Sequence, residues 1–206
     1  MLKMDCTELN WIGPCMNMNA MSHIHIVFNQ NVGEPLPIGK GRIIRRPGGF
    51  GVNGDKNTRG KSREDRIAIL SIGTRLHDSL ISASDIEDAN PTVGVTVADA
   101  RFMKPLDEDL IRSLVDDHSI LITIEEGSVG GFGDHVLHFL AKDGLLDDGN
   151  LKFRPMNLPD ELFEAATQHE QYEMAKLNHP YITELLQGLL KKNMKVPVLE
   201  EQTAEA

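Results

Sequence analysis

Two adjacent carboxylates, Glu125 and Glu126, directly follow the short apolar run 120–124. Such a run is typical of a buried strand, and α/β sheets keep their chemical sites at the carboxyl ends of their strands. A buried carboxylate beside another has a raised pKa, which would suit general acid–base catalysis. Adjacent residues of an extended segment point in opposite directions, however. We therefore favour a structural role, in which one glutamate accepts hydrogen bonds from loop amides and the other faces a partner surface.

A second charged group, Asp99, Arg101 and Lys104, follows the apolar run 93–98. The two cations could orient a phosphorylated substrate, because phosphate is recognised by Arg and Lys. We favour the alternative, in which an Asp–Arg pair braces the loop or contacts another subunit.

Three glycines, Gly130, Gly131 and Gly133, separate the run 119–125 from the next predicted helix. Backbone amides ahead of a helix can cradle an anion, helped by the helix dipole. Glycines also occur where the backbone must pass close to another element. The loop lacks the full dinucleotide fingerprint, and no ribose-binding acid follows it, so we favour close passage.

Metal and nucleotide sites have weaker support. His135 and His138 are three residues apart on one predicted helix, without an evident third ligand. The run 54–62 has five residues rather than four between its glycines and precedes a strand, so it does not fit a P-loop. A possible zinc set near the N-terminus lacks finger-like spacing. Its members are Cys6, Cys15, His23 and His25.

Apolar periodicity predicts strands that alternate with helices. The strands are expected at 67–72, 93–98, 119–125 and 151–154, with 41–46 as a plausible edge strand. The helices are expected after Thr74, from about Asp107, from about Gly133, over 161–169 and from Pro180.

Particular roles follow from this pattern. Thr74 and Asp107 are each expected to cap a helix. Val136, Leu137 and Leu140 are expected in the core, and proline at 155 and 159 is expected to form turns. The last helix carries a core-facing stripe. Its residues are Ile182, Leu185, Leu186, Leu189 and Leu190.

The alternation predicts a three-layer α/β/α fold with a mostly parallel sheet of four or five strands. We expect a poorly ordered leader over residues 1–33, one domain over 34–192 and an acidic tail over 193–206. The glycine- and charge-rich segment 47–64 is expected to be a flexible insertion in the domain.

Composition excludes several classes of partner. The 206 residues carry a formal net charge of −10, which argues against nucleic acid and anionic membrane surfaces. We see neither an apolar run of about 20 residues that would span a bilayer nor a secretory signal. Two cysteines are too few for a disulfide framework, so a reducing compartment is expected.

Several long motifs resemble the last domain of the 1-deoxy-D-xylulose-5-phosphate synthase family, thiamine-diphosphate enzymes of the transketolase superfamily. The motifs are LPIGKGRIIRR (36–46), DRIAILSIGT (65–74), VADARFMKPLD (97–107), ITIEEGSVGGFGDHVL (122–137) and DGLLDDGNLKFRPMNLPD (143–160). The resemblance covers roughly residues 34 to 190. The family pattern breaks after Asp160, where a glycine turn is replaced by a segment with helical character.

The resemblance implies a transketolase C-terminal-domain-like fold. The family's transferases condense pyruvate with glyceraldehyde 3-phosphate in the non-mevalonate route to isoprenoids. Their thiamine diphosphate and Mg²⁺ lie in the two preceding domains, and this chain lacks the GDG run and paired asparagines that hold them. We therefore assign no catalytic, cofactor-binding or metal-binding residue, and expect no cofactor on this chain alone. Its compartment would be the bacterial cytoplasm or a plastid.

Two hypotheses remain open. In the first, the chain is a structural and dimerisation part of the synthase, inactive alone, which binds the missing catalytic domains or a second copy of itself. In the second, it is a stand-alone interaction module that binds a protein partner through the segment 47–64.

Overall fold

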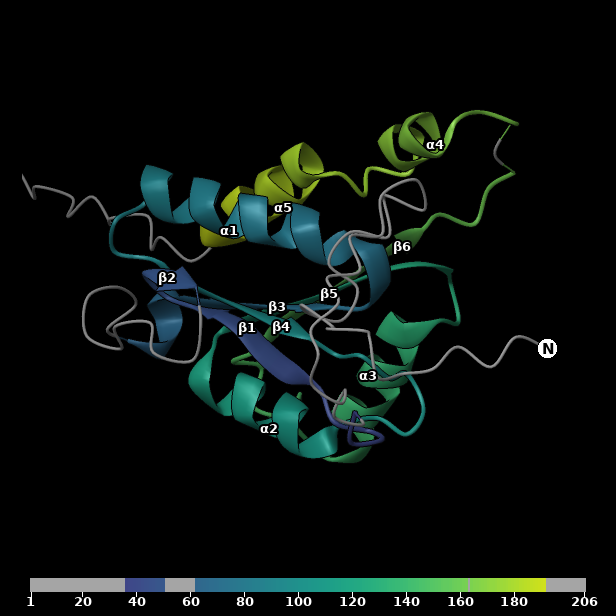
Figure 1. Ribbon diagram of the computed structural model, residues 1–206. Helices are drawn as coiled ribbons and strands as arrows, with labels where there is room; N and C mark the ends of the chain where they lie inside the picture. Colours follow the sequence, from purple (N-terminus) through teal and green to yellow (C-terminus); the bar gives the residue numbers. More distant parts are fainter. Residues whose placement is uncertain (1–35, 51–61, 163, 192–206) are drawn as a thin grey trace, which may run out of the picture.

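The computed structural model describes residues 36–50, 62–162 and 164–191 (Figure 1). Within these ranges, strands and helices alternate along most of the chain. The strands are β1 (Arg42–Arg46), β2 (Gly49–Phe50), β3 (Arg66–Ser71), β4 (Gly94–Asp99), β5 (Ile120–Ser128) and β6 (Lys152–Leu158). The helices are α1 (Leu76–Ala89), α2 (Glu108–Asp117), α3 (Phe132–Lys142), α4 (Gln168–Met174) and α5 (His179–Lys191), with 3-10 turns at Arg63–Asp65 and Gly73–Arg75.

The strands form one sheet in the order β2-β1-β4-β3-β5-β6. The four strands from β4 to β6 are parallel, whereas β1 is antiparallel to both β2 and β4. The predicted mostly parallel sheet is confirmed, with β2 as an additional two-residue strand inside the segment expected to be a loop.

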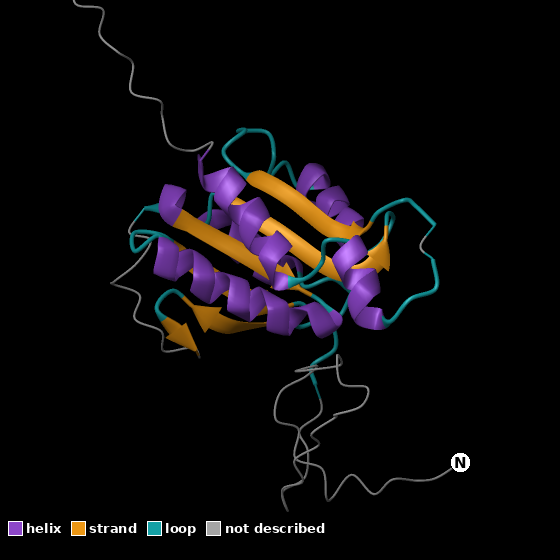
Figure 2. Ribbon diagram, turned by 90° about the horizontal axis from the view of Figure 1, so that it is seen from above, coloured by secondary structure: helices purple, strands orange, loops and turns teal. Residues whose placement is uncertain are grey.

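Helices cover both faces of the sheet (Figures 1 and 2). Alternate residues of β3 point to opposite sides, so that Ile67 and Ile69 pack with α1 and α5, while Ala68 and Leu70 pack with α2 and α3. All four are almost fully buried. This arrangement is the predicted three-layer fold, and it explains why the inner parallel strands β3, β4 and β5 are largely apolar and buried.

Two predicted features of the helices are confirmed. Asp107 caps α2, because its carboxylate accepts a hydrogen bond from the amide of Leu110. The same carboxylate accepts from the amide of Gly41 at 2.9 Å, which ties the approach to β1 to the start of α2. The predicted stripe on α5 faces the core, with Ile182 and Leu186 fully buried.

Thr74 does not cap α1, contrary to the sequence prediction. It lies in the 3-10 turn that precedes the helix, and Arg75 occupies the N-cap position without a side-chain cap. The Thr74 hydroxyl instead contacts Glu126 at the end of β5.

Leu137 is not part of the core. The buried face of α3 is formed by Phe132, Val136, Phe139 and Leu140, which follow the helical i, i+4, i+7, i+8 spacing. Leu137 lies beside this stripe and is 37% exposed.

Two predictions after residue 150 are also wrong. Pro155 lies inside β6 rather than in a turn, and β6 is the last strand of the sheet within the described ranges, a position that tolerates a missing amide proton. The predicted helix over 161–169 does not form, because α4 begins only at Gln168, after a capping box between Thr167 and Glu170. Leu162 is fully exposed, so an earlier helix would have no packed face to stabilise it.

Several predictions lie outside the described residues. They are the zinc set at Cys6, Cys15, His23 and His25, the P-loop-like run up to residue 61, the leader 1–33 and the tail 193–206. Across the part of the chain that the structure describes, no helix is both long and apolar enough to cross a membrane.

Candidate functional site

The candidate site lies at the carboxyl ends of β3 and β5, which are neighbours in the sheet. After β3 the chain turns to α1 on one face, and after β5 it turns to α3 on the other. Loops that diverge to opposite faces leave a crevice between them, and open α/β sheets bind their ligands at such points. Glu125 and Glu126 stand on β5 at this edge.

Glu125 is bound by the start of α3. Its carboxylate accepts hydrogen bonds from the backbone amides of Phe132 at 2.8 Å and Gly133 at 2.7 Å, and only 6% of the residue is exposed. The amide of Gly130 is likewise close to the Asp134 carboxylate. The chain's own carboxylates therefore occupy amides that could otherwise have received an external anion.

The glycines let this loop wrap closely around Glu125. A Cβ atom on Gly131 would lie 2.3 Å from Glu125 Oε2, and one on Gly133 would lie 2.8 Å from Cβ of Pro155. Gly130 meets no such contact, but its φ of +91° favours glycine. The close-passage interpretation accounts for these contacts.

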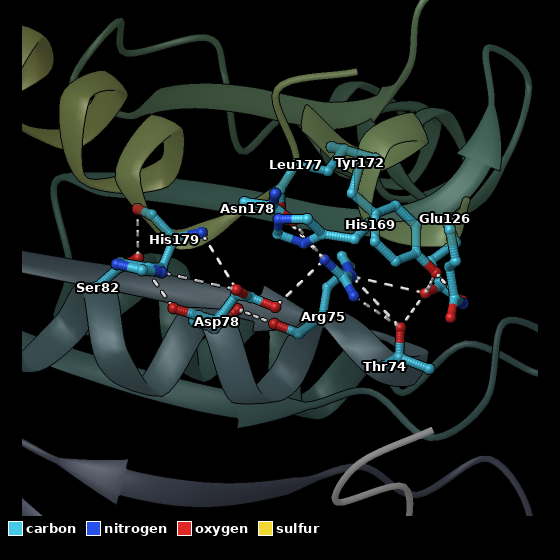
Figure 3. A network of polar contacts seen from close by, with 12 residues as sticks. Thr74, Arg75, Asp78, Ser82, Glu126, His169, Tyr172, Leu177, Asn178 and His179 are labelled. Atoms are coloured by element: carbon cyan, nitrogen blue, oxygen red, sulfur yellow. Dashed lines mark hydrogen bonds and ion pairs between the residues drawn. The ribbon is translucent and has the colours of Figure 1, made fainter. Parts of the chain in front are cut away.

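Glu126 points away from Glu125 and joins a polar network between α1, β5 and α4 (Figure 3). The hydroxyls of Thr74 and Tyr172 donate to Oε1 of Glu126, and Arg75 Nε lies 3.5 Å from the same oxygen. Burial raises the pKa of the Tyr172 phenol, and the neighbouring Glu126 raises it further. The phenol therefore stays protonated as a donor, and the glutamate oxygen is committed to three internal contacts.

Arg75 is the centre of this network, and its residue exposure is 0%. Its guanidinium lies over the Tyr172 ring, 3.7 Å from the centroid, and pairs with Asp78 at 3.2 Å. It also donates to the backbone carbonyl of Leu177 and the side-chain oxygen of Asn178. A buried guanidinium needs such compensation, and here it connects α1 to the linker between α4 and α5.

A polar pocket of about 320 Å³ lies beside the network. Both histidines in its lining lie near acids, with His169 Nε2 4.0 Å from Glu173 and His179 Nδ1 3.9 Å from Asp78. The rest of the lining comes from Gln168, Tyr172, Asn178 and Pro180. No group of three His, Cys, Asp or Glu side chains among the described residues could hold a metal ion, and this includes His135 and His138.

The second charged group gathers around Asp99 at the end of β4. Asp99 is 2% exposed, lies 3.6 Å from Arg42 Nε and 4.0 Å from Arg101 Nε, and accepts from the Arg101 amide at 3.0 Å. Burial raises the pKa of the Asp99 carboxyl against the opposing effect of these donors. Lys104 is exposed, and the structure does not bring it into this group. A role of any of these residues at an interface stays a prediction.

The sequence did not reveal the roles of Arg75, Tyr172 and Asn178. Arginine is rarely fully buried, so its type gave no signal for the centre of a network. The Thr167-x-x-Glu170 capping box was visible in the sequence and could have placed the start of α4, and with it Tyr172.

Two comparisons with known proteins bear on this fold. A family model for the transketolase C-terminal domain matches residues 57–182, more than half of the chain. Among solved structures, one described as "Split gene transketolase, inactive beta4 tetramer" is similar with a TM-score of 0.57 and 19% sequence identity. The match covers 76% of this chain but 44% of that one, and at this identity the likeness is one of fold.

Proposed function

We propose that this chain, which belongs to the transketolase C-terminal domain family, is the closing domain of a 1-deoxy-D-xylulose-5-phosphate synthase-type enzyme. The complete enzyme would condense pyruvate with glyceraldehyde 3-phosphate, release CO2 and form 1-deoxy-D-xylulose 5-phosphate. The domain would be inactive alone and would bind the catalytic domains of that enzyme. The synthase-type specificity rests on the motifs at 97–107 and 122–137.

The observation that supports a structural role is that the carboxylates at the carboxyl edge of the sheet are bound by groups of the chain itself. Glu125 is held by the amides of Phe132 and Gly133, and Glu126 by Thr74 and Tyr172. These contacts join the loops of the domain to one another. They supply a rigid edge for docking rather than a free acid or base.

The cofactor fits the two preceding domains of the synthase family better than this domain. Thiamine diphosphate would supply the carbanion chemistry of the enzyme, and its diphosphate is held through Mg²⁺. The described residues offer no cluster of three metal-ligating side chains, and the sequence has no GDG run. The catalytic steps would therefore take place on the other domains of the enzyme.

The test combines the purified chain with a polypeptide that carries the thiamine-binding domains of such a synthase. Release of CO2 from pyruvate, dependent on glyceraldehyde 3-phosphate, is measured for each component and for the mixture, with thiamine diphosphate and Mg²⁺ present. We expect activity in the mixture and none in the chain alone. Calorimetric titration of the chain alone with thiamine diphosphate and Mg²⁺ is the control, and micromolar binding there would overturn the proposal.

Self-association is the second expectation. A similar structure is described as an inactive β4 tetramer of a split-gene transketolase, which supports the idea that this chain also assembles with itself. Sedimentation equilibrium of the chain should then show a dimer or larger species that dissociates when the catalytic polypeptide is added. A monomer that captures an unrelated protein partner instead would favour the interaction-module hypothesis.

A further inference from the structure

A groove of about 450 Å³ lies between β6 and α5, away from the network around Arg75. Its apolar lining comes from Met156 on β6 and from Leu185 and Leu189 on α5. A Cβ atom on Gly188, which also lines the groove, would have no heavy atom within 4 Å, so a ligand backbone can approach the helix closely there.

Two exposed cations, Arg154 and Lys176, border this apolar lining, together with Tyr181 and Glu184. Arg154 donates to the carbonyl of Phe153 at 2.6 Å. Within the described ranges, neither cation forms an ion pair with a carboxylate. Two cations stand against one carboxylate, Glu184, in this lining, so the groove suits an occupant that is partly apolar and partly negatively charged.

The chain itself contains such a segment. Residues 192–206 read KNMKVPVLEEQTAEA, in which the apolar run 196–199 is followed directly by Glu200 and Glu201. Proline at 197 disfavours helical backbone at the residue before it and favours an extended segment. Its apolar residues are complementary to the apolar lining of the groove, and its two glutamates are complementary to the two cations.

The segment can reach the groove. α5 ends at Lys191, and its last turn lies against the start of β6, where Lys152 Nζ donates to the carbonyl of Leu189 at 3.2 Å. The helix from Tyr181 to Lys191 is about 15 Å long. Residues 196–201 follow Lys191 by five to ten positions, which corresponds to roughly 17–33 Å of extended chain. A chain that turns back after α5 can therefore lie along the groove.

We propose that residues 196–201 dock in this groove of their own chain. The apolar run covers Met156, Leu185 and Leu189, and Glu200 and Glu201 pair with the two cations on the rim. Covalent connection gives the tail an effective concentration in the millimolar range, so weak contacts suffice. The proposal does not depend on the proposed function, because it concerns contacts within the isolated chain.

The experiment is nuclear magnetic resonance of the full chain with labelled methyl groups. We expect nuclear Overhauser effects between methyls of Val196, Val198 and Leu199 and those of Leu185 and Leu189. The variants E200K/E201K and R154E/K176E should each reduce these signals at least fivefold. The chain that combines all four substitutions should recover them, because the charges are exchanged. Lys142→Glu, on α3, is the matched control and should leave the signals unchanged.

Two outcomes would overturn the proposal. The first is an absence of these nuclear Overhauser effects in the unsubstituted chain, or effects whose intensity is unchanged in both charge-reversed variants. The second is signals that occur only between labelled and unlabelled copies in a mixed sample, which would assign the groove to the tail of a second copy. Recovery in the four-substitution chain excludes a trivial loss of folding, since both groups of substitutions are then present.

Discussion

The guanidinium of Arg75 lies 3.7 Å from the ring centroid of Tyr172 and is completely buried. Arg75 directly precedes α1 and Tyr172 lies on α4, so this contact connects two residues that are almost 100 positions apart in the chain. Glu126 joins both residues, since Arg75 Nε and the Tyr172 hydroxyl approach the same carboxylate oxygen. The position of α4 at the carboxyl edge of the sheet therefore depends on the buried guanidinium of Arg75 and the Tyr172 ring that stacks on it.

The first prediction separates the ring of Tyr172 from its hydroxyl. Tyr172→Ala removes the ring from a buried guanidinium and should lower the free energy of unfolding by about 3–4 kcal/mol. Tyr172→Phe keeps the ring and removes one hydrogen bond, with an expected loss of about 1 kcal/mol. Urea unfolding followed by circular dichroism measures both. Equal losses for the two variants would contradict the assigned importance of the stacking.

The second prediction concerns the glycine loop around Glu125. Gly131→Ala places a methyl group 2.3 Å from Glu125 Oε2 and should destabilise the fold by about 1–3 kcal/mol. Gly130→Ala meets no atom, but its φ of +91° makes alanine strained, at about 1–2 kcal/mol. The additional substitution Glu125→Ala distinguishes the two.

Removal of the Glu125 carboxylate relieves the clash at Gly131 but not the strain at Gly130. The coupling energy with Glu125→Ala, from urea unfolding of the single and double variants, should thus be large for Gly131→Ala and near zero for Gly130→Ala. A similar coupling at both glycines would mean that the backbone, not the carboxylate, sets the cost at Gly131.

The sequence was sufficient for the layers but not for the site. β3 and β4 are buried on both faces, so their apolar runs were visible without any tertiary information. The network around Arg75 could not be predicted in this way. Arg75 and Tyr172 come together only after the chain has passed from one face of the sheet to the other and back. Thr74 illustrates the same limit. Its type and position before a helix suggested a cap, yet the contact with Glu126 on a neighbouring strand determined its role.

The third prediction is a pH dependence that originates at His118. The imidazole Nδ1 donates to the carbonyl of Leu114, and Nε2 accepts from the Thr96 hydroxyl, which suits the neutral ring. Burial lowers its pKa to about 4, although the Leu114 hydrogen bond opposes this. In the unfolded chain the His118 imidazole is therefore protonated as the pH falls below about 6.5. In the folded chain it is protonated only near pH 4.

The contribution of His118 to the free energy of unfolding is therefore fully present above pH 6.5. It is lost as the pH falls toward 4, by about 3 kcal/mol in total. Urea unfolding between pH 7 and 4 should show this slope. His118→Gln removes the titrating group and should flatten that part of the profile, even if the variant is less stable at pH 7. An unchanged slope in the variant would assign the pH dependence to the carboxylates.

The fourth prediction tests Lys176, which follows α4 with a φ of +57°. The amides of Lys176 and Leu177 donate to the carbonyls of Glu173 and Tyr172, the pattern of a helix end that prefers glycine at this position. Lys176→Gly should therefore stabilise the fold by about 0.5–1 kcal/mol in urea unfolding.

The same change removes one cation from the groove between β6 and α5, so docking of residues 196–201 should weaken while stability rises. Lys176→Arg is the matched control, because it keeps both the charge and the strained backbone and should change neither quantity. A loss of stability in Lys176→Gly would show that the lysine side chain contributes more to the fold than its backbone strain costs.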